Sequence, residues 1–417
     1  MAQLSDDCFA IGGNLLGIDV ARRMIYERVA PVTGIERVPV RRALGRTLAQ
    51  DITAPIAVPG FDNSAVDGYA VYFDDLDPAT ETRLRVTGRA AAGHPYSETL
   101  VRGTALRIFT GAALPDGADA VMMQEDCERT GDLVTIRPGI KRGANTRRAG
   151  EDVARHSVAL SAGRRLGPAD LGLLAALGLA EVPVHRRVSV ALLSTGDEVR
   201  EPGESLRHGQ IYDANRFILA AMLERLGVEL TDFGIVNDDP ASLGEALCRA
   251  AAETDLIVTS GGVSTGEEDH VRTAIASHGS LYFWRLAIKP GRPVAMGQVG
   301  ATPLAGLPGN PVAALLTFAL VARPMVEALS GTTAHVARRF RVVSDFSYSK
   351  KPGRREYVRV SLDAGTGVAV RARRYSKEGA GMLTSLTETD GLVELPEELT
   401  KLHPGTEVDF VPYSELI

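Results

Sequence analysis

The chain has 417 residues, and its 46 Lys and Arg residues are nearly balanced by 52 Asp and Glu residues, which gives a formal net charge of −6. A hydrophobic fraction of 45% and a charged fraction of 24% are typical of a globular protein, and the length predicts two to four domains. The mildly acidic balance argues against a protein that coats nucleic acid or a membrane surface, so we expect neither as a partner.

Cysteine usage and apolar runs give further exclusions. Cys8, Cys127 and Cys248 lie far apart, without the spacing of zinc ligands or of a disulfide framework. The first residues include two acids and no basic segment, unlike a secretory signal. The longest apolar run, 312–322, is too short to cross a bilayer, and we therefore expect a cytoplasmic protein.

The first half of the chain predicts one helix followed by short strands and long loops. Residues 19–29 place apolar side chains at helical spacing, with an acid in the first turn. Short β-like runs follow at 84–86, 104–109 and 133–136. Two polar, glycine-rich segments, 55–67 and 141–152, have the length of functional loops.

The pattern changes near Arg187. Apolar strands then alternate with amphipathic helices, in the order 188–195, 215–226, 228–236, 242–252, 255–262 and 269–277. This alternation predicts a parallel, doubly wound sheet with helices on both faces, which binds ligands beyond the carboxyl ends of its strands. A last helix is predicted to run to Leu329, with Asn310 as its cap and Pro311 in its first turn.

From about residue 336 the sequence again consists of short alternating strands, which predict a small barrel or sandwich. The predicted fold is therefore multidomain α/β plus β, with a central doubly wound α/β domain, a loop-rich β domain and a C-terminal small β-barrel. The expected domains are a discontinuous N-terminal linker and β domain at 14–55 and 153–186, the loop-rich β domain inserted in it at 56–152, the α/β domain at 187–335, and the barrel at 336–417.

Two glycine-rich loops directly follow predicted strands of the α/β domain. STGDE, which contains Glu198, follows the first strand, and TSGGVSTGEEDH, which contains Ser260, Gly261 and Gly262, follows the third. The backbone N–H groups of such loops converge on anions, and a following helix N-terminus adds its dipole. The alternative interpretation of each loop is a tight structural turn.

Acids at the same sheet edge point to a divalent cation. Mg²⁺ takes one or two carboxylates together with substrate phosphates and waters, so Glu198, Asp238 and Asp269 are candidate ligands. Helix capping is the alternative role for Asp238, which precedes an Asp-Pro pair, and for Asp269 at a helix start.

A retained lysine and a proline-rich turn follow. The chain has only six Lys against 40 Arg, yet LAIKPGRP keeps Lys289, whose compact ammonium suits a phosphate or oxyanion contact. A lysine without function is the alternative. LAGLPGNPVAA places Pro308, Gly309 and Pro311 in a rigid loop suited to a flat ring or an anion, or to a structural turn alone.

Three segments of the first half add charged and hydroxyl groups. VPGFDNSAVDGYAV contains Asp67, RIFTGAALPDGADAVMMQED places Thr110 after a strand, and KRGANTRRAGEDV groups Arg147 with Asp152. Arginines beside carboxylates suit an anion site, although solvated charge is the commoner explanation of such a run.

Taken in order, eight motifs resemble the molybdopterin molybdenumtransferase family, the MoeA type that includes the C-terminal part of gephyrin. The motifs are NSAVDGYA, RIFTGAALPDGADAV, GANTRRAGEDV, STGDE, GQIYDANR, TSGGVSTGEEDH, FWRLAIKPGRP and GLPGNP, and the resemblance runs from about residue 14 to the end. The α/β subset is also similar to molybdopterin adenylyltransferases and CinA-like proteins, which lack the flanking β regions.

The resemblance implies an elongated homodimer whose active cleft joins the α/β domain of one subunit to the loop-rich domain of the other. It implies that adenylylated molybdopterin and molybdate, with Mg²⁺, give molybdenum cofactor and AMP. Expected partners are a molybdopterin adenylyltransferase and cofactor-accepting molybdoenzymes. The positions that match the family's functional residues are, for catalysis, Asp67, Thr110, Arg147, Asp152, Glu198 and Lys289; for substrate, Ser260, Gly261, Gly262, Arg285, Pro308, Gly309, Pro311 and Ser385; and for metal, Asp238, Asp269 and Glu198.

Two positions depart from the family pattern. Arg285 stands where the family often has Lys, and Ala380 stands where it commonly has Ser, so a hydroxyl contact there either comes from Thr384 or Ser385 or is absent. Two alternatives remain: a scaffold of the same fold that binds a partner protein, and an adenylyltransferase or nucleotide hydrolase that uses the α/β domain alone.

Overall fold

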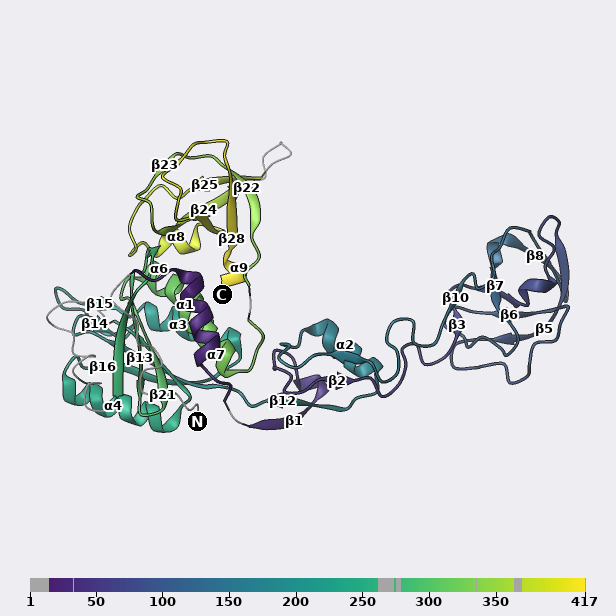
Figure 1. The fold of residues 1–417 in the computed structure, drawn as a ribbon, viewed down its shortest axis with the longest axis horizontal. Coiled ribbons are helices and arrows are strands. Elements are labelled where there is room, and N and C mark those ends of the chain that lie inside the picture. The colour runs from purple at the N-terminus through teal and green to yellow at the C-terminus, as the bar shows by residue number, and fades with distance from the viewer. Residues whose placement is uncertain are drawn as a thin grey trace.

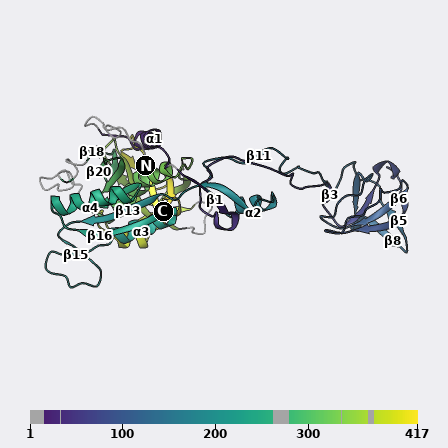
Figure 2. The same cartoon turned by 90° about the horizontal axis from the view of Figure 1, so that it is seen from below.

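The computed structural model describes residues 15–32, 34–261, 274, 279–334, 336–363 and 370–416. Its parts follow one another along an elongated molecule (Figure 1). An α/β unit and a barrel lie together at one end, a small linking lobe comes next, and a β-sheet lobe, here called the distal lobe, lies at the other end in both views (Figures 1 and 2). The predicted combination of α/β and β regions is confirmed.

The α/β unit is built on a six-stranded sheet with the order β16-β13-β17-β21-β20-β18. Strands β16, β13, β17 and β21 are parallel, whereas β20 is antiparallel to both of its neighbours. The sheet is therefore mixed rather than wholly parallel, because a turn too short for a crossover joins β20 to β21. The strands are β13 (Ser189–Thr195), β16 (Glu229–Val236), β17 (Leu256–Ser260), β18 (Gly279–Arg285), β20 (Pro293–Val299) and β21 (Thr302–Leu307).

Helices cover both faces of this sheet, as the alternating pattern predicts. Successive side chains of a strand point to opposite faces, so Val190 and Leu192 pack on one side, and Ala191 and Leu193 on the other. The first side is covered by α1 (Ile18–Arg28), α3 (Asn215–Leu226), α6 (Pro311–Thr317) and α7 (Arg323–Leu329), and the second by α4 (Pro240–Glu253). The helix expected at 269–277 lies outside the described residues, apart from Ala274.

The last helix of the unit is a core helix. Among the described residues, Pro311–Leu329 is the one segment with the length and hydropathy of a membrane span, 19 residues with a mean hydropathy of 1.7, but 94% of that window is buried inside the protein. The prediction that Asn310 caps it is wrong in one respect, because its side chain makes no capping hydrogen bond. The Val312 N–H instead donates to the Ala380 carbonyl of the barrel, at 3.0 Å.

The C-terminal region forms a closed barrel. Its sheet runs β24-β25-β22-β28-β26, and a further pairing of β24 with β26 closes the ring around a core that includes Val360, Val393 and Phe410. The short strand β19 (Ile288–Lys289) of the α/β unit adds to the barrel beside β24. The barrel strands are β22 (Phe340–Ser344), β24 (Arg355–Asp363), β25 (Arg371–Arg374), β26 (Gly391–Leu395) and β28 (Glu407–Pro412).

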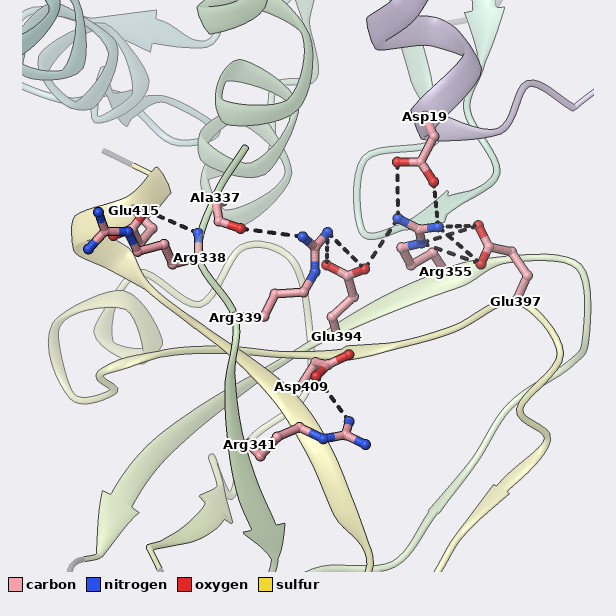
Figure 3. Close-up of polar contacts among 10 residues, drawn as sticks. All are labelled: Asp19, Ala337, Arg338, Arg339, Arg341, Arg355, Glu394, Glu397, Asp409 and Glu415. Carbon is pink, nitrogen blue, oxygen red and sulfur yellow. Dashed lines mark hydrogen bonds and ion pairs between the residues drawn. The ribbon is translucent and has the colours of Figure 1, made fainter. Parts of the chain in front are cut away.

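A polar network holds the barrel against the leading helix (Figure 3). Arg355, the first residue of β24, donates to Asp19 of α1 at 2.8 Å and pairs with Glu394 and Glu397 of the barrel, each at 3.2 Å. Burial alone would lower the pKa of Arg355, but Asp19 and Glu394 raise it above its usual range. The guanidinium therefore ties the barrel to the α/β unit as a charged group.

The linking lobe and the distal lobe each have their own core. The linking lobe contains β1 (Ile35–Pro39), β2 (Ile52–Thr53), β11 (Val158–Leu160), β12 (Glu181–His185) and α2 (Pro168–Ala176) around Leu48, Leu174 and Val184. In the distal lobe, the sheet order is β7-β4-β6-β5-β9-β8, with apolar clusters on both faces. The strands of this sheet are β4 (Gly68–Val71), β5 (Thr82–Ala90), β6 (Thr104–Ile108), β7 (Ala120–Met123), β8 (Cys127–Thr130) and β9 (Leu133–Ile136). Two short strands, β3 (Asn63–Ser64) and β10 (Thr146–Arg147), form a separate pair in the same lobe.

Asp255, which precedes β17, receives two hydrogen bonds from Arg186 at 2.7 and 2.6 Å and two from Ser189. Burial alone would raise the pKa of Asp255, but these bonds outweigh it and hold the pKa below its usual value. We expect Asp255→Asn to lower the free energy of unfolding by about 2 kcal/mol at pH 7, because Arg186 loses its charged partner.

Since the folded-state pKa is depressed, this stabilisation is present above the unfolded pKa of about 4 and is lost as the pH falls through the folded value. Urea unfolding, followed by the fluorescence of the single tryptophan Trp284 in the α/β core, measures it. Glu253→Gln, at the exposed end of α4, is the control and should change little. An equal loss in both variants would contradict this role for Asp255.

Candidate functional site

A cavity of about 340 Å³ lies where β13 and β17 end and where α3 and α6 begin. We call it the strand-end cavity. Its position follows from the fold, because parallel strands with helices on alternate faces leave a crevice beyond their carboxyl ends. The residues that line it are Ser194, Thr195, Glu198, Val199, Ile211, Tyr212, Asp213, Ala214, Asn215, Ser260, Gly261, Gly309, Asn310, Pro311, Gly381 and Leu383.

Asn215, at the start of α3, joins two predicted loops across this cavity. Its side-chain N–H groups donate to Ser260 Oγ at 2.8 Å and to the Gly309 carbonyl at 2.7 Å. Its other atom, Oδ1, and the hydroxyls of Ser194 and Thr195 are buried, with no hydrogen-bond partner in the described part of the chain. A buried polar atom without a partner costs roughly 1–3 kcal/mol, so the cavity is suited to a polar ligand that would complete these bonds.

Gly261 is required by the backbone geometry of the second loop. Its φ angle is +87°, and a Cβ atom there would lie 2.5 Å from the Thr195 carbonyl oxygen. Only glycine fits this close approach, which brings the loop after β17 against the end of β13. Gly262 and Asp269, two further predicted site residues, lie outside the described residues.

Two of the predicted metal ligands come from neighbouring strand ends. Glu198 lines the strand-end cavity after β13, and Asp238 follows β16, the strand next to β13 in the sheet. The residue that caps α4 is Asp239, whose carboxylate accepts from Ala241 and Ser242 at 3.2 and 2.9 Å. Within the described ranges no group of three His, Cys, Asp or Glu side chains is assembled. Two carboxylates nevertheless fit Mg²⁺, which completes its shell with substrate oxygens and water.

A second cavity, of about 320 Å³, lies between the α/β unit and the barrel, and we call it the barrel cavity. Four cationic side chains and one carboxylate contribute to its wall, which suits an oxyanion. The charged residues are Lys289, Arg359, Arg374, Lys377 and Glu378, and the other lining residues are Pro290, Gly291, Tyr348, Tyr357, Val358, Tyr375, Gly379 and Ala380.

One barrel segment separates the two cavities. Gly379 and Ala380 line the barrel cavity, whereas Gly381 and Leu383 line the strand-end cavity. The hydrogen bond from Val312 to Ala380 fixes this segment over the start of α6. The cavities are therefore neighbours on either side of residues 379–383.

Three predicted substrate residues have other surroundings. Ser385 is fully buried; its hydroxyl accepts from Arg359 at 2.7 Å and donates to the Met382 carbonyl, so it orients Arg359. Arg285, at the end of the outer strand β18, and Pro308 line neither cavity.

The distal lobe gathers the site residues predicted in the first half of the chain. The Asp67 carboxylate accepts from the Thr110 N–H at 2.8 Å and from its hydroxyl at 2.7 Å, and these bonds hold the pKa of Asp67 below its usual value. Arg147 of β10 pairs with Asn63 of β3, and the Asp152 N–H donates to the Val58 carbonyl at 3.1 Å. The segments that contain Asp67, Thr110 and Arg147 with Asp152 therefore lie together in one cluster.

Sequence reasoning missed Arg107 in this cluster. Its guanidinium lies 4.5 Å from the centre of the Phe109 ring and donates to Gln124 at 2.7 Å, and its charge contributes to the lowered pKa of Asp67. The available signal was a basic residue two positions before an aromatic one in RIF, where strand alternation places both on one face.

The two groups of predicted residues do not meet within one chain. The distal lobe lies at the opposite end of the molecule from the α/β unit in both views (Figures 1 and 2). Asp67, Thr110, Arg147 and Asp152 therefore lie far from Glu198 and Lys289 of the same chain.

Three family models match successive parts of the chain. Residues 16–178 match the MoeA N-terminal region (domain I and II), residues 191–328 match a probable molybdopterin binding domain, and residues 341–413 match the MoeA C-terminal region (domain IV). The chain is 37% identical over 405 residues to the molybdopterin molybdenumtransferase of Haemophilus influenzae, and the alignment covers 97% of this chain and 100% of that protein. The chain belongs to the molybdopterin molybdenumtransferase family.

Two further matches extend over most of the chain. It is 38% identical over 381 residues to molybdopterin molybdenumtransferase 2 of Mycobacterium tuberculosis, covering 89% of this chain and 93% of that protein. The crystal structure of the molybdopterin biosynthesis moeA protein from Pyrococcus horikoshii has a TM-score of 0.81 at 29% identity, covering 96% of this chain and 100% of that one. The resemblance read from the motifs is confirmed.

The Thr110 hydroxyl supplies one of the two hydrogen bonds that lower the pKa of Asp67. We expect Thr110→Val to raise that pKa towards its usual value, while the bond from the residue 110 N–H keeps it from rising fully. An NMR titration of the side-chain carboxyl carbons measures the change. Asp77, whose pKa is lowered by bonds from Ala79 and Thr80, is the internal control; an unchanged Asp67, or a parallel shift of Asp77, would refute the assignment.

Proposed function

We propose that this protein inserts molybdenum from molybdate into adenylylated molybdopterin, with Mg²⁺, releasing AMP and forming molybdenum cofactor. The observation that carries the proposal is the adjacency of two unlike cavities. One offers carboxylates, unpartnered hydroxyls and a glycine-rich loop, and the other offers four cationic side chains. A phosphate-bearing pterin and a small oxyanion are substrates that need such a pair of neighbouring sites.

In the strand-end cavity, the adenylylated substrate would lie against the loops that Asn215 joins. The Gly261 N–H donates to the Leu307 carbonyl, so the hydroxyls of Ser194 and Thr195 are the groups suited to its phosphates. Gly309 and Pro311 form a rigid wall. Glu198 and Asp238, with Asp269, would hold Mg²⁺, which would neutralise charge on the departing phosphate.

In the barrel cavity, Lys289, Arg359, Arg374 and Lys377 would bind molybdate. The arginine and lysine side chains would contact the anion in different ways. A planar guanidinium donates hydrogen bonds in a fixed geometry, whereas a lysine ammonium acts as a compact point charge. Ser385 supports the site indirectly, because its hydroxyl fixes Arg359.

The distal-lobe residues would come from a second copy of the chain, in a homodimer. Asp67 is ionised at neutral pH, as an aspartate normally is, and the bonds from Thr110 favour that form further, so its carboxylate is available as a metal ligand or a proton acceptor. We propose that each chain has four domains: a discontinuous one at 14–55 and 153–186, and three others at 56–152, 187–335 and 336–417. We also propose that the protein is cytoplasmic. A molybdopterin adenylyltransferase would supply its substrate, and molybdoenzymes would accept its product.

The alternatives explain less of the chain. An adenylyltransferase or nucleotide hydrolase needs the α/β unit alone and gives no role to the barrel cavity or to Asp67. A scaffold would be free to lose acidic and lysine positions, yet Asp67, Glu198, Asp238 and Lys289 are all present.

The assay is incubation of the protein with adenylylated molybdopterin, Mg²⁺ and molybdate, with measurement of AMP and of reconstitution of an apo-molybdoenzyme. We expect AMP release that depends on molybdate, and a roughly 10²-fold lower rate for Lys289→Gln, as for other lost donors to a reacting anion. Lys401→Gln, on the exposed barrel surface, is the matched control. AMP release that does not depend on molybdate would favour the adenylyltransferase or hydrolase. No AMP release under any condition would favour the scaffold.

Mixing two inactive variants tests the composite site. Asp67→Asn and Lys289→Gln each damage both sites of a homodimer, but a mixed dimer has one site with both changes and one unchanged site. Random exchange makes about half of the dimers mixed, so we expect about one quarter of the unmodified activity to return. A chain that completes its own site would show no recovery on mixing.

A further inference from the structure

Glu356 is a buried carboxylate beside the barrel cavity that neither the motifs nor the proposed function uses. It is 1% exposed, and its Oε2 atom accepts from the Tyr348 hydroxyl at 2.8 Å and lies 3.4 Å from Lys289 Nζ. Its Oε1 atom lies 3.4 Å from a guanidinium nitrogen of Arg354. A carboxylate this deeply buried is costly unless it is paired, so these partners account for its presence.

The backbone fixes the contact between Glu356 and Lys289. Strand β19 pairs with β24 in parallel, and the register places Lys289 beside Glu356. The carboxylate is fully enclosed, whereas the Lys289 side chain is 56% exposed at the cavity wall. The pair therefore has an inner anchor and an outer cation.

Tyr348 completes the arrangement. Its ring centre lies 6.0 Å from Lys289 Nζ and 4.9 Å from the Arg374 guanidinium, so the ring stands near two cations of the barrel cavity. Burial alone would lower the pKa of Lys289, but Tyr348 and Glu356 outweigh it and raise the pKa above its usual value. The same contacts therefore favour the charged ammonium form of Lys289.

Resting on the proposed function, we propose that Glu356 is a positioning residue which, with Tyr348, holds the Lys289 ammonium at the wall of the barrel cavity for contact with the oxyanion. A free lysine side chain loses rotamer entropy when it binds an anion, and an anchor removes part of that cost before the anion arrives. An ammonium has three N–H donors, so its contacts with Glu356 and Tyr348 leave at least one for the anion.

Arg355, which precedes Glu356 in the chain, has a different role. Arg355 and Glu356 follow each other in β24, so their side chains leave opposite faces of the strand. Arg355 reaches Asp19 of α1 and the barrel carboxylates Glu394 and Glu397 (Figure 3). Loss of Glu394 should therefore weaken the packing of the barrel without releasing Lys289.

A double-mutant cycle tests whether Glu356 acts through Lys289. The variants are Glu356→Gln, Lys289→Gln and their combination, with kcat/KM for molybdate as the readout. We expect Glu356→Gln alone to lower it about tenfold, the size of one hydrogen bond to a charged group, and to have little further effect when Lys289 is already changed. Tyr348→Phe should lower it by less. Effects that multiply in the double variant would overturn the proposal.

A second readout does not depend on activity. With six lysines in the chain, ¹³C-dimethylated protein gives few NMR signals, and that of Lys289 is the one lost in Lys289→Arg. We expect Glu356→Gln to move this signal and lower the pKa of Lys289, and the matched variant Glu394→Gln to leave both unchanged. Thermal unfolding of both variants reports on packing.

The outcomes separate the two proposals. An unmoved Lys289 signal in folded Glu356→Gln would overturn the positioning role even if molybdate-dependent AMP release is observed. A moved signal in a protein that never releases AMP would uphold the anchored lysine and refute the proposed function instead.

Discussion

The contact between the barrel and the α/β unit is the interaction on which both candidate cavities depend. Strand β19 extends the barrel sheet, Val312 donates to Ala380, and Arg355 joins α1 to the barrel carboxylates. Each of these contacts satisfies polar groups at the boundary: a strand edge, a helix N-terminal N–H and the mostly buried guanidinium of Arg355. Because residues 379–383 line both cavities, a shift of the barrel would change the shape of both.

The α/β unit could be predicted from local pattern, because its signals are short in range. Continuous apolar strands, period-3.6 helices and the glycine at position 261 are each read within a few residues, and the strand-end cavity follows from topology. The barrel cavity depends on contacts between residues far apart in the chain, such as Lys289 with Glu356 and Arg359 with Ser385. No local pattern indicates that Ser385 is enclosed, or that Ala380 satisfies the helix that Asn310 was predicted to cap.

The net charge of the chain and the charge of its candidate site differ. A net charge of −6 excludes a general polyanion binder, yet four cations line one cavity. Most arginines whose partners are described here serve the fold: Arg186 with Asp255, Arg216 with Asp213, and Arg355 with Asp19 are all paired with carboxylates. Lys289 differs, because its anchor is buried and its ammonium is exposed. Local geometry, and not the total charge, decides what this surface binds.

In the homodimer proposed above, each half of the candidate site must be organised before the two halves meet. Asp67 meets this requirement through Thr110, a neighbour within its own lobe, so its ionised state does not depend on a distant lobe. Lys289 meets it through Glu356 and Tyr348 on the barrel side. Assembly of two such halves has less conformational entropy to overcome, since the reacting groups are already charged and oriented. A composite site of this kind can therefore tolerate a long, two-stranded connection through the linking lobe, because the connection has only to bring the halves together and not to shape either one.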